Sequence, residues 1–143
     1  MKKLLLLNGP NINMLGKRDK NIYGSFTLEE LERDLASFVE KSGYHLDAFQ
    51  SNHEGDLVDR LHAADGEYAG IIFNPAAYTH TSIALHDAIE AIGTPVIEVH
   101  ISNVHKRESF RHVSMTAPAC HGQIVGLGKQ GYMLAASAFI NNF

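Results

Sequence analysis

Cysteine, excess positive charge and long apolar runs are all scarce in this chain of 143 residues, and each scarcity excludes a class of protein. The single cysteine, Cys120, rules out a disulfide within the chain and fits a reducing compartment, so we expect a cytoplasmic protein. The net charge of −4 does not favour binding to nucleic acid or to an anionic membrane surface, since both attract positively charged proteins. The apolar run of residues 4–7 is too short for a signal peptide or a membrane span, and predicts a first strand instead.

Motifs of metal chemistry and of covalent catalysis are missing as well. The nine histidines include no H-E-x-x-H spacing and no cysteine partner, so we predict no metal site. No G-K-[ST] phosphate loop and no G-x-S-x-G nucleophile motif occurs. Cys120 has no nucleophile signature around it, and His45, His53, His62 and His112 are given no functional role.

One glycine motif has to be weighed against a cofactor site. Residues 126–131, Gly-Leu-Gly-Lys-Gln-Gly, match G-x-G-x-x-G between an apolar run and a helical pattern. A dinucleotide site also needs a following βαβ unit and an acidic residue about 20 positions further on, and neither follows here. We interpret these glycines as a tight turn into the last helix and predict no cofactor.

Short apolar runs alternate with amphipathic helical patterns along the whole chain. Such alternation predicts a parallel sheet with helices on both faces, because right-handed crossovers place helices on both sides. The predicted strands are residues 4–7, 44–51, 69–73, 95–99 and 123–125. The first predicted helix starts at the capping box Thr27-x-x-Glu30. Three further helices are predicted at about residues 56–64, 81–92 and 132–141. We therefore expect one domain, residues 1–143, of the α/β class with a flavodoxin-like strand order.

Chemistry-bearing residues follow the first and fourth predicted strands. His100 falls where residues 95–99 end, and ligands of open α/β sheets bind outside the carboxyl ends of the strands. The backbone of Ile101 and Ser102 could hold an anion, with Arg107 and Arg111 close behind in the sequence. A plain polar loop after a strand remains the alternative interpretation of this stretch.

The polar segment of residues 8–24 is long for a loop in a compact domain, and such loops are usually functional. It carries Arg18 and Tyr23, flanked by Gly16 and Gly24 as possible hinges. Tyr23 could equally be an aromatic anchor that holds the loop down. After the third strand, Asn74 stands where a receiver domain needs an aspartate, so that class is excluded. The remaining inventory suits proton transfer on a polar, anionic organic substrate.

Longer motifs make the chain resemble one known family. They are Asn8 to Gly16 (Asn-Gly-Pro-Asn-Ile-Asn-Met-Leu-Gly), Arg18 with Ile22-Tyr-Gly24, and the four segments of residues 50–55, 74–82, 98–103 and 126–132. In this order they resemble type II 3-dehydroquinate dehydratase over essentially the whole chain. That family usually has a proline two residues after the loop arginine, where this chain has Lys20. The resemblance implies a flavodoxin-like subunit in a dodecamer built from trimers, and cofactor-free conversion of 3-dehydroquinate to 3-dehydroshikimate and water.

The resemblance also implies roles for individual residues. Tyr23 would be the base that removes a proton beside the ketone, and His100 the acid that protonates the departing hydroxyl. Arg18 would stabilise the charge at Tyr23, Asn11 would hold a water against the enolate oxygen, and Glu98 would orient His100. The substrate-binding residues would be Asn74 with the backbone of Ile101 and Ser102 at the carboxylate, and His80, Arg111 and the Asp87 of a neighbouring subunit at the ring hydroxyls.

A tyrosine base is plausible only under one physical condition. A free tyrosine has a pKa of about 10, and bringing that value near 7 takes roughly 4 kcal/mol. A cation about 4 Å away supplies about 1 kcal/mol in water, but about 4 kcal/mol at an effective dielectric constant near 20. Arg18 can therefore activate Tyr23 only if the segment of residues 8–24 closes and excludes water.

Two other function classes and one assembly hypothesis remain open on the sequence. A flavin or nucleotide carrier can have the same fold, and a dehydratase can work through a lysine imine, although no lysine follows an apolar strand here in a way that would desolvate it. We also expect His80, Ala84, Asp87 and Ala91 to lie on one side of the helix after the third strand. The small alanines would leave that side free to pack against another subunit.

Overall fold

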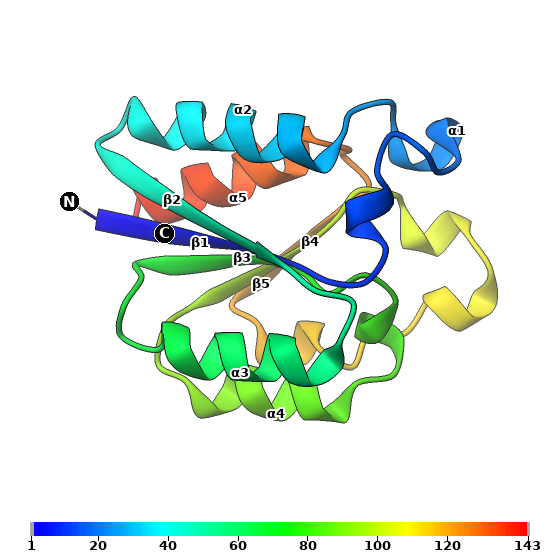
Figure 1. The fold of residues 1–143 in the computed structure, drawn as a ribbon. Helices are drawn as coiled ribbons and strands as arrows, with labels where there is room; N and C mark the ends of the chain where they lie inside the picture. Colours follow the sequence, from blue (N-terminus) through cyan, green and yellow to red (C-terminus); the bar gives the residue numbers. More distant parts are fainter. Residues whose placement is uncertain (1, 143) are drawn as a thin grey trace.

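Five parallel strands form the centre of the molecule, and helices cover both faces of the sheet (Figure 1). The structure, a computed structural model, describes residues 2–142. The strands are β1 (Lys2–Asn8), β2 (Tyr44–Gln50), β3 (Gly70–Asn74), β4 (Val96–His100) and β5 (Gly122–Val125). Their order is β2-β1-β3-β4-β5, with parallel pairing throughout. The predicted flavodoxin-like fold is confirmed.

The alternation of side chains in β1 shows how each face of the sheet is covered. Leu4 and Leu6 belong to a buried cluster with α2 (Leu28–Glu40) and α5 (Gln130–Ile140). Leu5 and Leu7 belong to the opposite cluster, with α3 (Glu54–Ala64) and α4 (Ile83–Ala91). Because successive strand residues point to opposite faces, a run of four leucines fills both cores at once.

The observed bounds differ from the predicted ones by about two residues at most element ends. The helix α3 begins earlier than expected, at Glu54, and α5 begins at Gln130, so Gly131 lies inside the helix rather than before it. A Cβ at Gly131 would lie 3.3 Å from a methyl carbon of Val99 on β4. The glycine thus lets the start of α5 approach the sheet closely, in addition to the turn we predicted, in which Gly126 and Gly128 adopt positive φ.

Two of the expectations for irregular segments were wrong in detail. The segment 8–24 contains a 3-10 turn, η1 (Ile12–Met14), and a short helix, α1 (Lys20–Tyr23), although we expected no regular structure there. One turn of helix is too short to produce an apolar period, so its sequence carries no such signal. The 3-10 turn η2 (Ala76–His80) holds His80, and Ser82 caps α4 instead, so His80 does not belong to the helical row with Ala84, Asp87 and Ala91.

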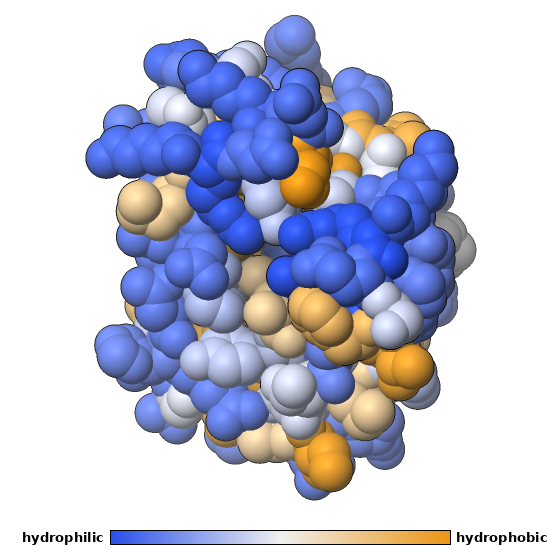
Figure 2. All heavy atoms as spheres, turned by 90° about the vertical axis from the view of Figure 1, so that its right-hand side faces the viewer, coloured by the Kyte–Doolittle hydropathy of each residue, from blue (hydrophilic) through white to orange (hydrophobic). Residues whose placement is uncertain are grey.

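The carboxyl ends of β1, β3 and β4 meet at one edge of the sheet. Asn8 and Asn74 are direct partners in the β1–β3 register, and His100 ends β4 two residues beyond the last β3 pair. The segment 8–24 with α1 and the loop after β4 both lie at this edge, which is the right-hand side of Figure 1. Figure 2 looks directly onto it and shows a hollow with hydrophilic side chains on either side.

Candidate active site

A cavity opens at this edge, between three segments that follow β1, β3 and β4. The first segment contributes Pro10, Asn11, Ile12, Arg18 and Tyr23; the second Asn74, Ala76, Ala77 and His80; the third His100, Ile101, Ser102, Val104, Arg107 and Arg111. The structure thus brings together nine of the eleven residues to which the family resemblance gives a role. The other two, Glu98 and Asp87, lie behind His100 and on α4, respectively.

Tyr23 ends the one-turn helix α1 and is buried, with 8% of its surface exposed. The side chain of Asp19 caps this helix by accepting from the amide of Asn21, which sets the turn that carries Tyr23. A terminal nitrogen of Arg18 donates to the Tyr23 hydroxyl at 2.7 Å. The Arg18 guanidinium also lies 3.7 Å from the centre of the tyrosine ring. One short helix therefore delivers a buried phenol already in contact with a cation.

Arg107 is a second cation beside Tyr23, and we gave it no separate role from the sequence. Its guanidinium carbon lies 5.2 Å from the centre of the Tyr23 ring, and it donates to the Ser102 hydroxyl at 3.3 Å. The contact joins the loop after β4 to the segment of residues 8–24 after β1, which we name the lid segment for its proposed closure. Tyr23 and Arg107 are 84 positions apart in the sequence, and only the fold brings them together. The one sequence signal for a role of Arg107 was its position close behind His100.

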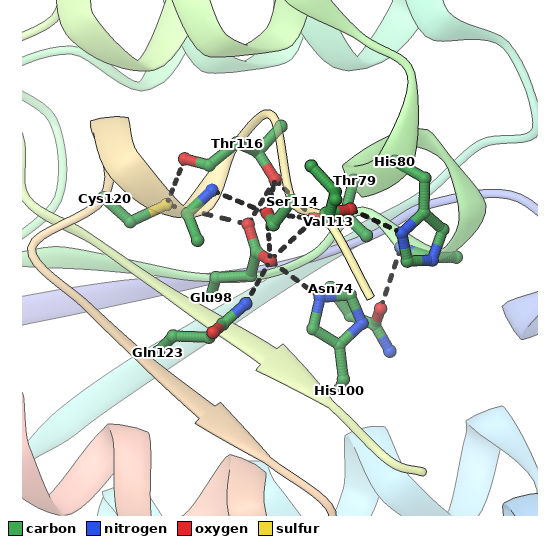
Figure 3. A network of polar contacts seen from close by, with 12 residues as sticks. Asn74, Thr79, His80, Glu98, His100, Val113, Ser114, Thr116, Cys120 and Gln123 are labelled. Atoms are coloured by element: carbon green, nitrogen blue, oxygen red, sulfur yellow. Dashed lines mark hydrogen bonds and ion pairs between the residues drawn. The ribbon is translucent and has the colours of Figure 1, made fainter. Parts of the chain in front are cut away.

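His100 and Glu98 point to the same side of the sheet, because they are two residues apart on β4. The His100 Nε2 lies 2.7 Å from the Glu98 Oε2, and both side chains are buried (Figure 3). A carboxylate can only accept, so Nε2 carries a hydrogen and Nδ1 is the nitrogen left for chemistry in the cavity. Burial by itself raises the pKa of Glu98, but hydrogen bonds from His100, Thr116 and Thr79 outweigh it, so the pKa lies below its usual value.

Asn74 ends β3 and is held by a buried tyrosine of α5. Its Nδ2 donates to the Tyr132 hydroxyl at 2.8 Å, and that hydroxyl donates in turn to the Asn8 Oδ1 at 2.9 Å. The Asn74 Oδ1 accepts from the amide of Ala76 at 2.9 Å. Burial raises the pKa of Tyr132, so its hydroxyl stays protonated and can fill both roles. The orientation of the Asn74 amide, with one N–H left for the cavity, is therefore fixed.

The backbone at the start of the lid segment is tied to the segment after β2. Asn11 adopts a positive φ of 70°, a conformation that asparagine tolerates better than most residues. Its amide donates to the Asn52 Oδ1 at 3.0 Å, and the Gln50 side chain donates to the Gly9 carbonyl at 3.1 Å. These contacts explain why residues 50–55 belong to the functional pattern without lining the cavity.

His80 and Arg111 face the cavity from its other side. The His80 Nδ1 lies 2.8 Å from the Val113 carbonyl, which can only accept, so Nδ1 carries the hydrogen and Nε2 is an acceptor when the ring is neutral. Burial lowers the pKa of His80, which favours that neutral form. The Arg111 Nε donates to a Glu108 oxygen at 3.2 Å. An acceptor and a guanidinium side by side suit the hydroxyls of a polar ligand.

The glycine turn after β5 supports the backbone of the anion-binding stretch. The Gly126 amide donates to the His100 carbonyl at 3.1 Å, and the Gly128 amide donates to the Ile101 carbonyl at 3.0 Å. The motif that resembled a dinucleotide fingerprint therefore fixes the peptide units next to His100. Its function in this fold is to brace the edge of the cavity.

Asp87 lies apart from the cavity of its own chain. It is exposed on α4, in a shallow surface depression with Ile83, His86, Met115 and Pro118. Ile83 is 65% exposed and Met115 36% exposed, so Asp87 stands beside apolar side chains that face outward.

The cavity combines a phenol beside two guanidinium groups with an imidazole beside a buried carboxylate, and a third guanidinium, that of Arg111, lines the same cavity. This arrangement can hold an anion and move protons at two places on it. Among residues 2–142, no group of three or more His, Cys, Asp or Glu side chains is placed to hold a metal ion. Over the same residues, no helix is long and apolar enough to cross a bilayer.

Comparisons with known proteins agree on one family. Residues 2–140 match the family model described as dehydroquinase class II. A relative from Bacillus cytotoxicus named 3-dehydroquinate dehydratase is 61% identical over 140 residues, covering 98% of this chain and 96% of the relative. The crystal structure of a type II dehydroquinase from Butyrivibrio crossotus has a TM-score of 0.94 at 45% identity, covering 96% of this chain and 97% of that one. One from Propionibacterium acnes has a TM-score of 0.95 at 38% identity, covering 99% and 97%.

Proposed function

The chain belongs to the class II dehydroquinase family, and from this premise we propose that it dehydrates 3-dehydroquinate with Tyr23 as the base and His100 as the acid. Membership makes the reaction a hydro-lyase reaction of the shikimate pathway: 3-dehydroquinate loses water and becomes 3-dehydroshikimate. The observation that carries the mechanism is the 2.7 Å contact between Arg18 and the Tyr23 hydroxyl, inside a cavity that His100 also lines.

In the first step, Tyr23 acts as a phenolate and takes a proton from the carbon beside the ketone. The electron pair of the broken C–H bond moves onto the ketone oxygen and produces an enolate. Arg18 and Arg107 stabilise the phenolate before the transfer, because both guanidinium groups lie against the Tyr23 ring. Asn11 holds a water molecule against the enolate oxygen and so stabilises the intermediate.

In the second step, the enolate re-forms the ketone while the carbon–oxygen bond of the leaving hydroxyl breaks. Hydroxide is a poor leaving group, so His100 donates a proton to that oxygen as it departs, and the products are a conjugated enone and water. Glu98 accepts from the Nε2 of His100 and stabilises its protonated form. The proton removed by Tyr23 and the one given by His100 balance, so the enzyme needs no cofactor or metal for the net reaction.

The remaining residues of the cavity hold the substrate in place for these steps. Asn74 and the backbone of Ile101 and Ser102 bind the carboxylate, and the fixed amide of Asn74 suits this task. His80 and Arg111 bind the ring hydroxyls, with the Nε2 of His80 as an acceptor. The three arginines give an otherwise acidic protein a locally positive cavity for an anionic substrate.

The site is completed, in this proposal, by a second copy of the chain. Exposed apolar patches next to polar residues commonly mark protein interfaces, and the face around Asp87 has this character. We infer that this face packs against the next subunit, where Asp87 reaches the ring hydroxyls, in a trimer that assembles further into a dodecamer. We place the enzyme in the cytoplasm, with 3-dehydroquinate as its small-molecule partner and no nucleic acid or membrane.

The direct test of the proposed function uses the product's own chromophore. Adding 3-dehydroquinate to the purified protein should produce the ultraviolet absorbance of a conjugated enone. Treatment with borohydride in the presence of substrate should leave the activity intact, because no lysine imine takes part. Inactivation by borohydride would contradict the Tyr23 mechanism and would support an imine instead.

A further inference from the structure

The carboxylate of Glu98 is the most heavily hydrogen-bonded group in the part of the chain that the structure describes, and it lies outside the cavity. Figure 3 shows donors converging on it from several elements. Oε2 accepts from the His100 Nε2 at 2.7 Å, the Thr79 hydroxyl at 2.8 Å and the Gln123 Nε2 at 2.8 Å. Oε1 accepts from the Thr116 hydroxyl, and Cys120 Sγ lies 3.9 Å away.

The number of donors fixes the ionisation state of Glu98. An ionised carboxylate has about four acceptor sites, and His100, Thr79, Gln123 and Thr116 supply four strong donors. A protonated Glu98 would itself have to donate from one oxygen, which would displace one of them. The hydroxyl of Ser114 lies 2.6 Å from that of Thr79, so it can donate there while Thr79 donates to Glu98.

We propose that Thr79 and Thr116, assisted by Gln123, are positioning residues for the proton donor His100, acting through Glu98. Thr79 is 1% exposed and Thr116 is fully buried, so water cannot replace either hydroxyl without a rearrangement. Each threonine holds a different oxygen, which prevents the carboxylate from rotating. Oε2 thus stays in line with the Nε2 of His100. This inference rests on the proposed role of His100 as the acid.

The same network connects two loop segments of the site to the sheet. Thr79 precedes His80, and its carbonyl accepts from the amide of Met115. Ser114 and Thr116 follow the loop that carries Arg111, and Gln123 belongs to the neighbouring strand β5. The carboxylate on β4 therefore sets the relative positions of the acid and of two substrate-binding segments.

The groups that face Glu98 determine the pH at which its carboxylate becomes protonated. His100 and Cys120 are the titratable ones; Thr79, Ser114, Thr116 and Gln123 are neutral donors from the other packed segments. Burial raises the pKa of the Cys120 thiol, so that group stays neutral. Removing a hydroxyl donor raises the pKa of Glu98, so its carboxylate is lost at a higher pH than in the wild type as the pH falls.

The test replaces the buried hydroxyl of Thr116 with a methyl group of the same shape. In Thr116→Val, kcat should fall about 10- to 100-fold, the loss expected for a hydrogen bond to a charged group, while KM changes less than about threefold. The acid limb of the kcat profile should move to higher pH. Thr116→Ser, which keeps the hydroxyl, should restore kcat and the pH profile to near wild type.

Thr94→Val is the matched control. Thr94 is a buried threonine whose hydroxyl accepts from the Gly66 amide at 2.9 Å, in the turn between α4 and β4, at the opposite end of the strand from His100. The Thr94→Val variant should lower the thermal stability of the protein, as Thr116→Val does, but it should leave kcat and the pH profile of kcat unchanged. A general effect of losing a buried hydroxyl would instead lower kcat in both variants.

Two further variants keep the test decisive. If Thr116→Val does not fold, Gln123→Leu removes a donor from an exposed position on β5 and should move the acid limb in the same direction. Wild-type kcat and pH profile in the folded variants would overturn the inference. The variant His100→Ala separates this result from the proposed function. If His100→Ala keeps the wild-type kcat, the proposed acid is wrong. If His100→Ala loses activity while Thr116→Val and Gln123→Leu keep the wild-type kcat, only the positioning role is wrong.

Discussion

At the scale of single residues, the site keeps two proton-transfer groups in opposite electrostatic surroundings. Tyr23 lies against the positive charges of Arg18 and Arg107, which stabilise a phenolate. His100 lies against the negative charge of Glu98, which stabilises an imidazolium. A base and an acid can therefore coexist in one cavity because each has its own counter-charge.

The contribution of His100 can be measured separately from binding. In His100→Ala, kcat should fall by about 10²- to 10⁴-fold, the usual range for a lost general acid, while KM stays near the wild-type value. Steady-state kinetics on this variant and on His62→Ala, an exposed position of α3, provide the comparison. A loss confined to KM would show that His100 only binds the substrate.

At the scale of elements, the lid segment is built from a one-turn helix between two glycines. The usual family proline is replaced by Lys20, which is the first residue of α1 after its cap Asp19. Proline is favoured at that position because its missing amide has no partner in the helix. Lysine can therefore occupy the same place without changing the hydrogen bonds of the turn, and the replacement affects only the stiffness of the chain.

Gly24 is the residue on which the lid conformation depends most. It has φ 81° and ψ −179°, a combination essentially restricted to glycine, and an added Cβ would lie 3.0 Å from the Phe26 ring. In Gly24→Ala we expect the free energy of unfolding to fall by about 1–3 kcal/mol, because alanine is strained in this conformation. We also expect a roughly tenfold lower kcat, because Tyr23 is displaced from Arg18.

Gly43→Ala is the control for this effect. Gly43 has the same φ of 81°, but an added Cβ meets nothing within 4 Å, and the residue lies between α2 and β2. Chemical denaturation and kcat should be measured on both variants. Gly43→Ala should be destabilised without loss of kcat; equal losses of kcat in both would contradict a specific role for the lid.

The sequence predicted the elements well wherever an apolar pattern repeats. Buried strands such as β3 and β4 and the amphipathic helix α2 carry their own periodicity, so their positions were correct within about two residues. His100, Ile101 and Ser102 could be singled out because they lie at the end of an apolar strand, whereas the role predicted for Tyr23 came from the family resemblance. The hydrogen-bond donors around Glu98 could not be predicted from the sequence. Thr79, Thr116 and Gln123 are 18 to 25 residues away from Glu98 and belong to no recognisable motif. The parallel pairing of β4 with β5, in which Glu98 and Gln123 are direct partners, and the folding of two turns bring them together.

At the scale of the whole molecule, the proposed site belongs to two chains. If Asp87 acts in the neighbouring subunit, Tyr23→Phe and Asp87→Ala should each damage every site when made alone. Unfolded together and refolded, the mixture should regain activity in proportion to chance pairing, because some sites then combine an intact Tyr23 with an intact Asp87. A mixture no more active than the two variants refolded separately would show that Asp87 does not act across an interface.

The central claim is the division of labour between Tyr23 and His100, and a hydrogen-exchange measurement tests it most directly. Wild type, Tyr23→Phe and His100→Ala are each incubated with 3-dehydroquinate in deuterium oxide, and the hydrogens beside the ketone are followed by proton NMR. His100→Ala should exchange one of these hydrogens for deuterium without releasing water, because the base still forms the enolate. Tyr23→Phe should neither exchange nor dehydrate; exchange in Tyr23→Phe as fast as in His100→Ala would contradict the assignment.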